Sequence, residues 1–399
     1  MARMPEGPAH DLAAMAVPGH GLRPLWHLDP QCHFLNHGSF GATPRQVLHA
    51  QDGWRLQMEQ QPVRFMGEVL PAALRNAADR LAAFLGTQGA QLGFVENTTA
   101  GINAILRSYP WKPGDAIVLA DHAYQAVRNT VQWLVQQSGV EVQWVQVPYP
   151  LHDANELAQA YCDQVTDRTR VVLVDHVFSP LAVVTPLHAV IDYCKQREVT
   201  VVIDGAHGPG MLSLALDALG ADWYVGNCHK WLCAPKGSAF VHRGVAARHA
   251  VHPAVISNFF DAGFTQEFDW QGTRDYSAWL SVPAALDFLE AFGVERYQQF
   301  LREQAGAAAQ RLCERWQVQL PAPADAFAGM VTIPWPGNEA ATPENAKRLH
   351  DGLWSAHRIE VPVIVANGQI WVRISAQIYN EMSDYEALAD ALSSSQISL

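Results

Sequence analysis

The chain has 399 residues, of which 49% are hydrophobic and 17% charged, and its formal net charge is −12 at pH 7. This composition is typical of a folded globular protein, and the length exceeds what one hydrophobic core usually supports, so we expect a large domain and a smaller one. The acidic balance, without a run of Lys or Arg, argues against a nucleic-acid or membrane-surface partner. No apolar run reaches the roughly 20 residues that a membrane-spanning helix needs.

The N-terminus and the cysteines indicate a protein of a reducing compartment. Residues 1–30 contain Pro and Gly and lack a clean apolar signal segment, so we expect a loose N-terminal arm and a cytoplasmic location. The six cysteines form no C-x-x-C pair and are expected to be reduced thiols. The 17 histidines are scattered, without H-E-x-x-H, so no metal site is predicted.

From residue 72 to residue 243 the sequence alternates between amphipathic segments, which predict helices, and short segments rich in Val and Ile, which predict strands. The strands are apolar on both faces, and this is typical of a mostly parallel sheet covered by helices on two sides. The predicted strands are 91–97, 115–120, 140–147, 169–177, 199–207, 222–230 and 236–243, and the predicted helices are 72–86, 99–108, 124–138, 153–164 and the stretch after Pro186.

The pattern changes near residue 277. Two long helices are predicted first, and short strands and further helices follow them. We interpret residues 31–275 as a large domain and residues 276–399 as a smaller C-terminal α/β domain, on which the N-terminal residues can also pack. The predicted elements of the smaller domain are helices at 277–293, 294–316, 343–357 and 383–394 and strands at 329–334, 360–365 and 369–375.

Two polar residues end neighbouring apolar strands. Asp204 follows the run VVI, at the edge where open α/β sheets bind ligands, although such an Asp can also simply cap a turn. Lys230 ends the next strand, and apolar surroundings lower the pKa of a lysine as a Schiff-base lysine requires; the alternative is a lysine whose ammonium group reaches water. Together they match the Asp and Lys that bind the ring nitrogen and the aldehyde of pyridoxal phosphate.

A third segment suits the phosphate of that cofactor. Residues 96–103, ENTTAGIN, end a strand and open a helix with Thr98 and Thr99. Their hydroxyls, the free backbone N–H groups and the helix dipole favour a dianion, although an ordinary threonine N-cap is the alternative. His229, beside the lysine, adds a further donor.

These features, in this order, resemble the class V aminotransferase family of fold-type I pyridoxal phosphate enzymes, over roughly residues 30–395. The resemblance implies an α/β fold whose large domain contains a mostly parallel seven-stranded sheet, with pyridoxal 5'-phosphate as cofactor and an amino acid as substrate. NHGSFG (36–41), PVRF (62–65) and FDWQGTRD (268–275) are most similar to the isopenicillin N epimerase-like branch. The family motifs are FLNHGSFG (34–41), ENTTAGIN (96–103), DGAHGPG (204–210), GNCHKW (226–231), QGTRDYSA (271–278) and WVRIS (371–375).

The resemblance also implies a role for individual residues at the cofactor ring. Lys230 would carry the cofactor as a Schiff base and move protons. Asp204 would pair with the ring nitrogen, and His207 would contact the phenolic oxygen. Either His122 or Tyr124 would stack on the ring, and the resemblance does not decide between them.

Other residues would contact the phosphate or the substrate. Thr98, Thr99 and His229 would hold the phosphate, and Gly272 and Thr273 would reach the phosphate of the neighbouring subunit in a homodimer. On the substrate side, the implied residues are Arg373, which would bind the carboxylate in a bidentate pair, and Asn36, His37 and Ser179.

The reaction is less constrained than the cofactor. A persulfide-forming cysteine desulfurase needs a nucleophilic Cys on the loop before the carboxylate-binding Arg, and residues 355–373 contain none. Epimerase-like or C–S lyase-like activity therefore ranks first, with Tyr124, His122 or a residue of NHGSFG (36–41) as a second acid/base, and an aminotransferase ranks second. Lys230, Asp204 and Arg373 together argue against a catalytically silent regulatory protein. A nucleotide-binding enzyme would need a G-x-G-x-x-G turn or a P-loop, which the sequence lacks.

Overall fold

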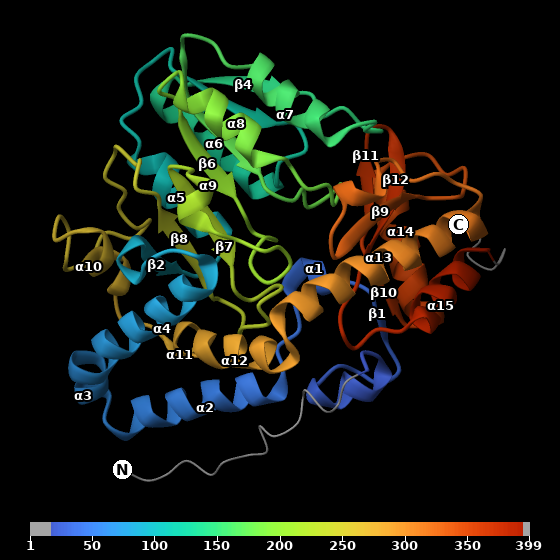
Figure 1. Ribbon diagram of the computed structural model, residues 1–399, viewed down its shortest axis with the longest axis horizontal. Coiled ribbons are helices and arrows are strands. Elements are labelled where there is room, and N and C mark those ends of the chain that lie inside the picture. Colours follow the sequence, from blue (N-terminus) through green and yellow to red (C-terminus); the bar gives the residue numbers. More distant parts are fainter. Residues whose placement is uncertain (1–16, 394–399) are drawn as a thin grey trace.

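A seven-stranded sheet forms the centre of the larger part of the molecule (Figure 1). The computed structural model describes residues 17–393. The strand order is β2-β8-β7-β6-β5-β3-β4, and all neighbours are parallel except those of β8, which runs antiparallel to β2 and β7. The predicted mostly parallel seven-stranded sheet is therefore confirmed. The strands are β2 Leu92–Val95, β3 Ala116–Ala120, β4 Glu141–Val145, β5 Thr169–Asp175, β6 Thr200–Asp204, β7 Trp223–Asn227 and β8 Ala239–Arg243.

Helices cover both faces of this sheet. Successive side chains of each strand point to opposite sides, and both sets are apolar, so both faces must be shielded from water. In β3, Ile117 and Leu119 join one buried apolar cluster, whereas Val118 and Ala120 join the other. This explains why the strands are apolar throughout. The helices of this part are α4 Leu70–Leu85, α5 Thr98–Ser108, α6 Gln125–Ser138, α7 Ala154–Asp163, α8 Leu187–Lys195, α9 Leu216–Leu219 and α10 Phe264–Asp269.

A three-stranded antiparallel sheet, in the order β11-β12-β9, organises the C-terminal part, drawn orange and red in Figure 1. Its strands are β9 Met330–Pro334, β11 Val363–Ala366 and β12 Gln369–Ser375, and its helices are α13 Val294–Trp316, α14 Pro343–His357 and α15 Met382–Ser393. The two helices before it, α11 Ser277–Leu280 and α12 Val282–Phe292, pack instead on α4 and on the N-terminal helix α2 Arg45–Gln60. The first helix to pack on β9 is α13.

The N-terminal segment bridges the two parts of the molecule. Strand β1 (His33–Phe34) pairs in parallel with β10 (Ile359–Glu360). Leu22 and Trp26 are buried in the apolar core, so residues 17–30 of the expected arm are docked and not loose, and residues 1–16 lie outside the described residues. The remaining elements are η1 His20–Leu25, α1 His37–Phe40, α3 Pro62–Arg64, η2 Phe65–Val69, η3 Gly89–Gln91 and η4 Ala324–Ala326.

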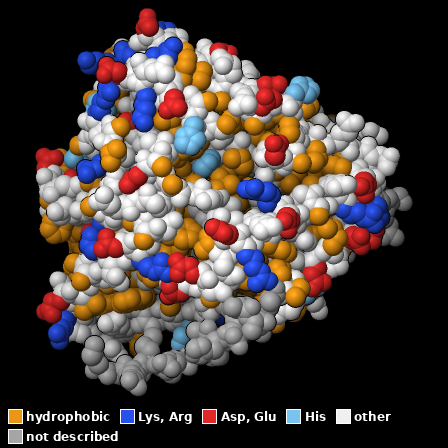
Figure 2. Space-filling view, in the orientation of Figure 1, with side chains coloured by type: hydrophobic (Ala, Val, Ile, Leu, Met, Phe, Trp, Pro, Cys, Tyr) orange, Lys and Arg blue, Asp and Glu red, His pale blue; other side chains and the backbone are white. Residues whose placement is uncertain are grey.

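The surface carries no dominant charge on the face that Figure 2 shows, where acidic and basic side chains are interspersed. Within the described residues, no helix is both long enough and apolar enough to cross a membrane.

Candidate active site

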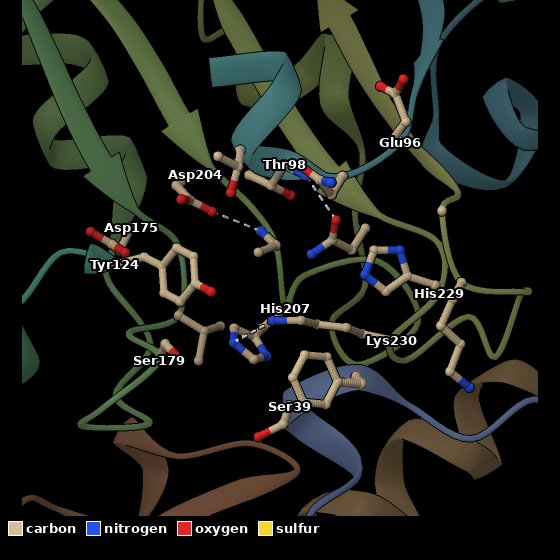
Figure 3. A pocket seen from close by; sticks show the side chains of 18 residues that line it. Ser39, Glu96, Thr98, Tyr124, Asp175, Ser179, Asp204, His207, His229 and Lys230 are labelled. Atoms are coloured by element: carbon tan, nitrogen blue, oxygen red, sulfur yellow. Dashed lines mark hydrogen bonds between the residues drawn. The ribbon is translucent and has the colours of Figure 1, made fainter. Parts of the chain in front are cut away.

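The carboxyl ends of β5, β6 and β7 open into a cavity of about 310 Å³ (Figure 3). The start of α5 and the end of the short helix α1 also contribute to its walls. Many of the predicted site residues meet here, although they are far apart in the sequence. The lining residues are Ser39, Phe40, Glu96, Asn97, Thr98, Thr99, Tyr124, Asp175, Val177, Ser179, Asp204, Ala206, His207, Asn227, His229, Lys230, Lys236 and Gly237.

Lys230 lies in a hydrogen-bonded chain with two aromatic residues. The indole Nε1–H of Trp231 donates to Nδ1 of His207 (3.3 Å), and Nε2 of His207 is 3.1 Å from Nζ of Lys230. Because an indole nitrogen can only donate, Nδ1 of His207 must accept, and the neutral ring therefore carries its proton on Nε2. That proton points toward the lysine, so the arrangement is satisfied when Lys230 is an uncharged amine.

The electrostatics of the pocket favour this uncharged amine. The pKa of Lys230 is lowered to about 7, chiefly by burial and then by the positive charge of Arg373, while Asp204 acts in the opposite direction. Burial also holds the pKa of His207 well below its usual range, helped by the charge of Lys230. A neutral lysine amine is the nucleophile that forms a Schiff base, so the pocket suits the predicted role of Lys230.

Two buried carboxyl groups share the opposite wall. Burial raises the pKa of Asp204 to about 6, while a hydrogen bond from the backbone N–H of Ala206 (3.1 Å) opposes the shift. Asp175, on the neighbouring strand, has a pKa raised by burial and then by the charge of Asp204. A cationic ring nitrogen placed beside Asp204 would compensate this buried negative charge, so the site fits a pyridinium.

Tyr224 supports the turn that carries Asp204 and His207. A Cβ atom at Gly205 would lie 2.1 Å from the Tyr224 ring, and one at Gly208 would lie 2.1 Å from the Tyr224 hydroxyl oxygen. The hydroxyl also forms a 2.9 Å hydrogen bond with Nδ1 of His176. The turn therefore needs glycine at both positions in order to rest on this tyrosine.

The start of α5 offers donors to an anion. The carboxamide oxygen of Asn97 accepts from the N–H of Ala100 (2.9 Å), and that of Asn227 accepts from the N–H of Thr98 (2.9 Å). The Thr98 hydroxyl is buried and has no hydrogen-bond partner within the described residues. An orphaned hydroxyl at a helix N-terminus is a site that a phosphate oxygen would satisfy, so this end of the pocket fits the cofactor phosphate.

His229 completes this end of the pocket in a defined orientation. Its Nδ1–H donates to the carbonyl oxygen of Ser238 (2.8 Å), which leaves Nε2 as the second site of the ring. Burial lowers the pKa of His229 to about 4. A phosphate dianion at Nε2 would favour the imidazolium form, because only that form donates from both nitrogens.

Arg373 is a buried cation without an acidic partner. It is 3% exposed, and within residues 17–393 its guanidinium forms no ion pair. It donates to the backbone oxygen and the hydroxyl of Ser179 (3.1 Å to Oγ) and to the hydroxyl of Ser39 (3.0 Å), while its Nε is buried without a partner. Burial lowers its pKa to about 10. A carboxylate of a bound ligand would relieve this unpaired charge.

Several predicted residues lie elsewhere. His37 is completely buried behind Lys230: its Nε2 is 3.0 Å from the Lys230 carbonyl oxygen and its Nδ1 is 2.9 Å from the Tyr379 hydroxyl, so it does not line the cavity on the substrate side. Asn36 lies beside Arg373, with Oδ1 3.5 Å from Nη2, but is also outside the cavity wall. Of the two stacking candidates, only Tyr124 lines the cavity.

His122 instead faces an adjoining cavity, where its Nδ1 lies 2.6 Å from Oδ1 of Asp121. Gly272 and Thr273 do not line the pocket of their own chain. The resemblance implies that they contact the cofactor phosphate of a second copy of the chain. That role stays a prediction.

The structure adds lining residues that sequence reasoning missed. Asp175 and Asn227 end β5 and β7 as Asp204 ends β6, so a polar residue at the end of a buried strand was the available signal. Lys236, whose ammonium group donates to the Thr43 hydroxyl (3.3 Å), and Ser39 carry no such signal. They reach the pocket from a loop and a four-residue helix.

Known proteins resemble this chain over most of its length. The model of the aminotransferase class V family matches residues 37–388. A probable chloroplastic L-cysteine desulfhydrase of Arabidopsis thaliana is 32% identical over 398 residues, covering 92% of this chain and 83% of the relative. An isopenicillin N epimerase of Amycolatopsis lactamdurans is 32% identical over 387 residues, covering 92% and 95%.

Solved structures show the same fold. The cystine C–S lyase C-DES, in complex with cysteine persulfide, superposes with a TM-score of 0.76 at 21% identity, covering 93% of this chain and 98% of that one. An apo cysteine desulfurase from Thermococcus onnurineus gives a TM-score of 0.76 at 18% identity, covering 94% and 97%. With its strand-end lysine and aspartate and its match over most of the length, the chain belongs to the aminotransferase class V family of pyridoxal phosphate-dependent enzymes.

Proposed function

We propose that Lys230 binds pyridoxal phosphate and that the enzyme acts at Cα or Cβ of an amino acid, as an epimerase or a C–S lyase. The observation that carries the proposal is Arg373, a buried guanidinium without an acidic partner in the described chain, beside the pocket that Lys230 lines. An amino-acid carboxylate bound there in a bidentate pair would bring the amino group and Cα toward Lys230.

Each residue then has a separate task. When bound, the cofactor supplies an electron sink for the bonds to Cα. Asp204 holds the proton on the ring nitrogen through its buried carboxylate. Lys230 accepts and returns a proton at Nζ, for which its pKa of about 7 is suited. Tyr124, at the rim of the pocket, is the candidate acid/base for the opposite face.

The cysteines support this choice of reaction. All six lie within the described residues, and none lines the pocket. Five are buried, and Cys313 lies on α13. A persulfide-forming desulfurase requires a thiol that reaches the substrate sulfur, so this reaction stays disfavoured. The names of the two relatives, an L-cysteine desulfhydrase and an isopenicillin N epimerase, agree with lyase and epimerase chemistry.

We further infer that two copies form the working unit. Phe40, which lines the pocket, is 72% exposed. Four more apolar side chains are exposed in the loop before α10, and a second copy would bury such a surface. These residues are Val255, Ile256, Phe259 and Phe260. The homodimer would place Gly272 and Thr273 at the cofactor phosphate of the neighbouring subunit. The cytoplasmic location stays a prediction from the sequence.

A single screen tests the reaction. The protein, reconstituted with pyridoxal phosphate, is incubated with individual amino acids while keto acid, sulfide, ammonia and optical rotation are followed in parallel. Loss of rotation without sulfide supports epimerisation, whereas sulfide with ammonia and a keto acid supports C–S lysis. The matched control is Lys230→Ala, which we expect to lack the borohydride-reducible cofactor adduct. An adduct that persists at the same position in this variant would contradict the assignment of Lys230.

A further inference from the structure

A second cavity, of about 490 Å³, adjoins the cofactor pocket. Tyr124 and Ser179 line both cavities. The start of α6 bounds the second cavity on one side, and residues 364–367, from β11 and the turn after it, bound it on the other. Of the residues given a role above, only Tyr124, His122 and Ser179 line this space, and none of the residues that suit the cofactor phosphate or ring nitrogen does.

The two cavities meet where the substrate carboxylate is expected. Arg373 lines neither cavity itself, but it donates to the hydroxyl of Ser179 (3.1 Å), which lines both cavities. An amino acid held by Arg373 therefore has its Cα beside the opening of the second cavity. A short side chain would end in the first cavity together with the cofactor, whereas a long side chain has the second cavity as its continuation.

The second cavity is lined by one guanidinium, that of Arg128, and by one carboxylate, that of Asp121. The Arg128 Nη1 donates to the Asp121 backbone oxygen (2.8 Å), its Nη2 donates to the Gln125 side chain, and its Nε has no partner. Within the described residues its guanidinium forms no ion pair. The Asp121 carboxylate accepts from the Val147 N–H (3.3 Å) and contacts the His122 ring, and it forms no ion pair with Arg128.

The opposite wall is apolar and comes from Ile364, Val365 and Ala366. A wall of this kind accommodates methylene groups, and a guanidinium at the far side binds a carboxylate through charge-assisted hydrogen bonds.

From this arrangement we propose that the second cavity is a distal subsite for an amino-acid substrate with a long aliphatic side chain that ends in a carboxylate, and that Arg128 determines this specificity. The inference rests on the proposed function, because Arg373 and Lys230 must hold the amino-acid end. It adds the substrate class: a substrate as short as cysteine would leave the second cavity unused, whereas an extended dianionic one would fill both.

A matched pair of ligands tests the subsite. L-2-aminoadipate and L-norleucine have side chains of the same length, and they differ in the terminal carboxylate. Binding to the holoenzyme is measured by titration calorimetry and by the change in cofactor absorbance, with L-alanine as a short reference. We expect L-2-aminoadipate to bind about tenfold more tightly than L-norleucine, as one charge-assisted hydrogen bond implies.

Variants assign the preference to Arg128. In Arg128→Gln the two ligands should bind within about twofold of each other, with L-alanine binding unchanged, and Arg128→Lys should keep part of the preference. The control is Arg107→Gln, because this guanidinium lies over the Trp133 ring (5.1 Å) and lines neither cavity. Val365→Trp, which narrows the cavity, should weaken both long ligands and spare L-alanine.

The outcomes separate the two proposals. If L-2-aminoadipate and L-norleucine bind the wild-type holoenzyme equally well, and L-alanine binds it too, the proposed subsite is wrong. The proposed function would then still stand. A preference that survives Arg128→Gln would remove Arg128 from the subsite. If no amino acid changes the absorbance or releases heat, the proposed function fails, and the subsite fails with it.

Discussion

Asp175 and Asp204 occupy equivalent positions on neighbouring parallel strands. They are register partners at the ends of β5 and β6, and both are buried and line the cofactor pocket. The Oδ2 atom of Asp175 is buried without a hydrogen-bond partner in the described chain. Burial and then the charge of Asp204 raise the pKa of Asp175, so the pair retains a proton that two exposed carboxylates would lose.

The first prediction concerns the stability of the apoprotein. A folded-state pKa raised above the ordinary value of 3.8 means that the folded state binds a proton that the unfolded state has released, so stability falls as pH rises from about 4 through the folded pKa. Asp175→Asn removes this loss. We expect a melting temperature at least about 2 °C higher at pH 8 and no difference near pH 4. The control is the exposed Asp192→Asn, and a lower melting temperature of Asp175→Asn at pH 8 would contradict the prediction.

The second prediction is the pH dependence of cofactor attachment. The neutral amine of Lys230 reacts, so borohydride trapping of pyridoxal phosphate by the apoenzyme should rise with pH through about 7 and then level off. Arg373→Gln should move the midpoint upward, because the Arg373 charge lowers the lysine pKa, and Asp204→Asn should move it downward. Mass spectrometry of the reduced adduct measures the yield. A midpoint near the ordinary lysine pKa would refute the account of Lys230.

The third prediction tests the phosphate end of the pocket. Asn227→Ala removes the acceptor that orients the Thr98 N–H, so pyridoxal phosphate should bind about tenfold more weakly while pyridoxal, which lacks the phosphate, should bind as before. Equilibrium dialysis with both ligands measures this ratio. The control is Asn129→Ala on the exposed side of α6. Equal losses for both ligands would show that Asn227 acts on the ring and not on the phosphate.

The fourth prediction is a double-mutant cycle at the turn that carries Asp204. Gly208→Ala places a Cβ 2.1 Å from the Tyr224 hydroxyl oxygen, whereas its next neighbours are 3.4 Å away. We expect a loss of about 2 kcal/mol in the free energy of unfolding. Tyr224→Phe removes the clashing oxygen at a cost of about 1 kcal/mol for the hydrogen bond to His176.

The double variant should then be more stable than the sum of the single losses predicts. Denaturant unfolding measures all four proteins, and Gly67→Ala is the control because a Cβ there has no neighbour within 4 Å. Simple additivity would mean that Tyr224 does not support this turn.

The central sheet was predictable because its strands are apolar on both faces and bounded by helices. The direction of β8 was not, because an apolar strand looks the same in a parallel and in an antiparallel pair. Helix α2 escaped prediction for another reason: among its 16 residues only Val47 and Gln51 are buried, which leaves almost no amphipathic pattern.

The site was predictable where a residue type and a strand end coincide, as for Lys230 and Asp204. It was not predictable where tertiary packing chooses the direction of a side chain. Nothing in the local sequence indicates that His37 turns toward the Lys230 carbonyl oxygen or that His122 turns toward Asp121. The contact of His37 depends on Lys230, which lies 193 residues further along the chain. Asp121, in contrast, is the residue next to His122, and only the direction of the two side chains is left to packing.

The pairing of His33–Phe34 with Ile359–Glu360 also affects the order in which the protein matures. The segment that carries α1 leaves the ribosome long before its partner strand exists, and β1 cannot dock until α14 and β10 have been synthesised. Ser39, which contacts Arg373, can therefore reach this partner only after β12 has been synthesised, near the end of translation. A nascent chain that has completed its central sheet would still lack one wall of its active site.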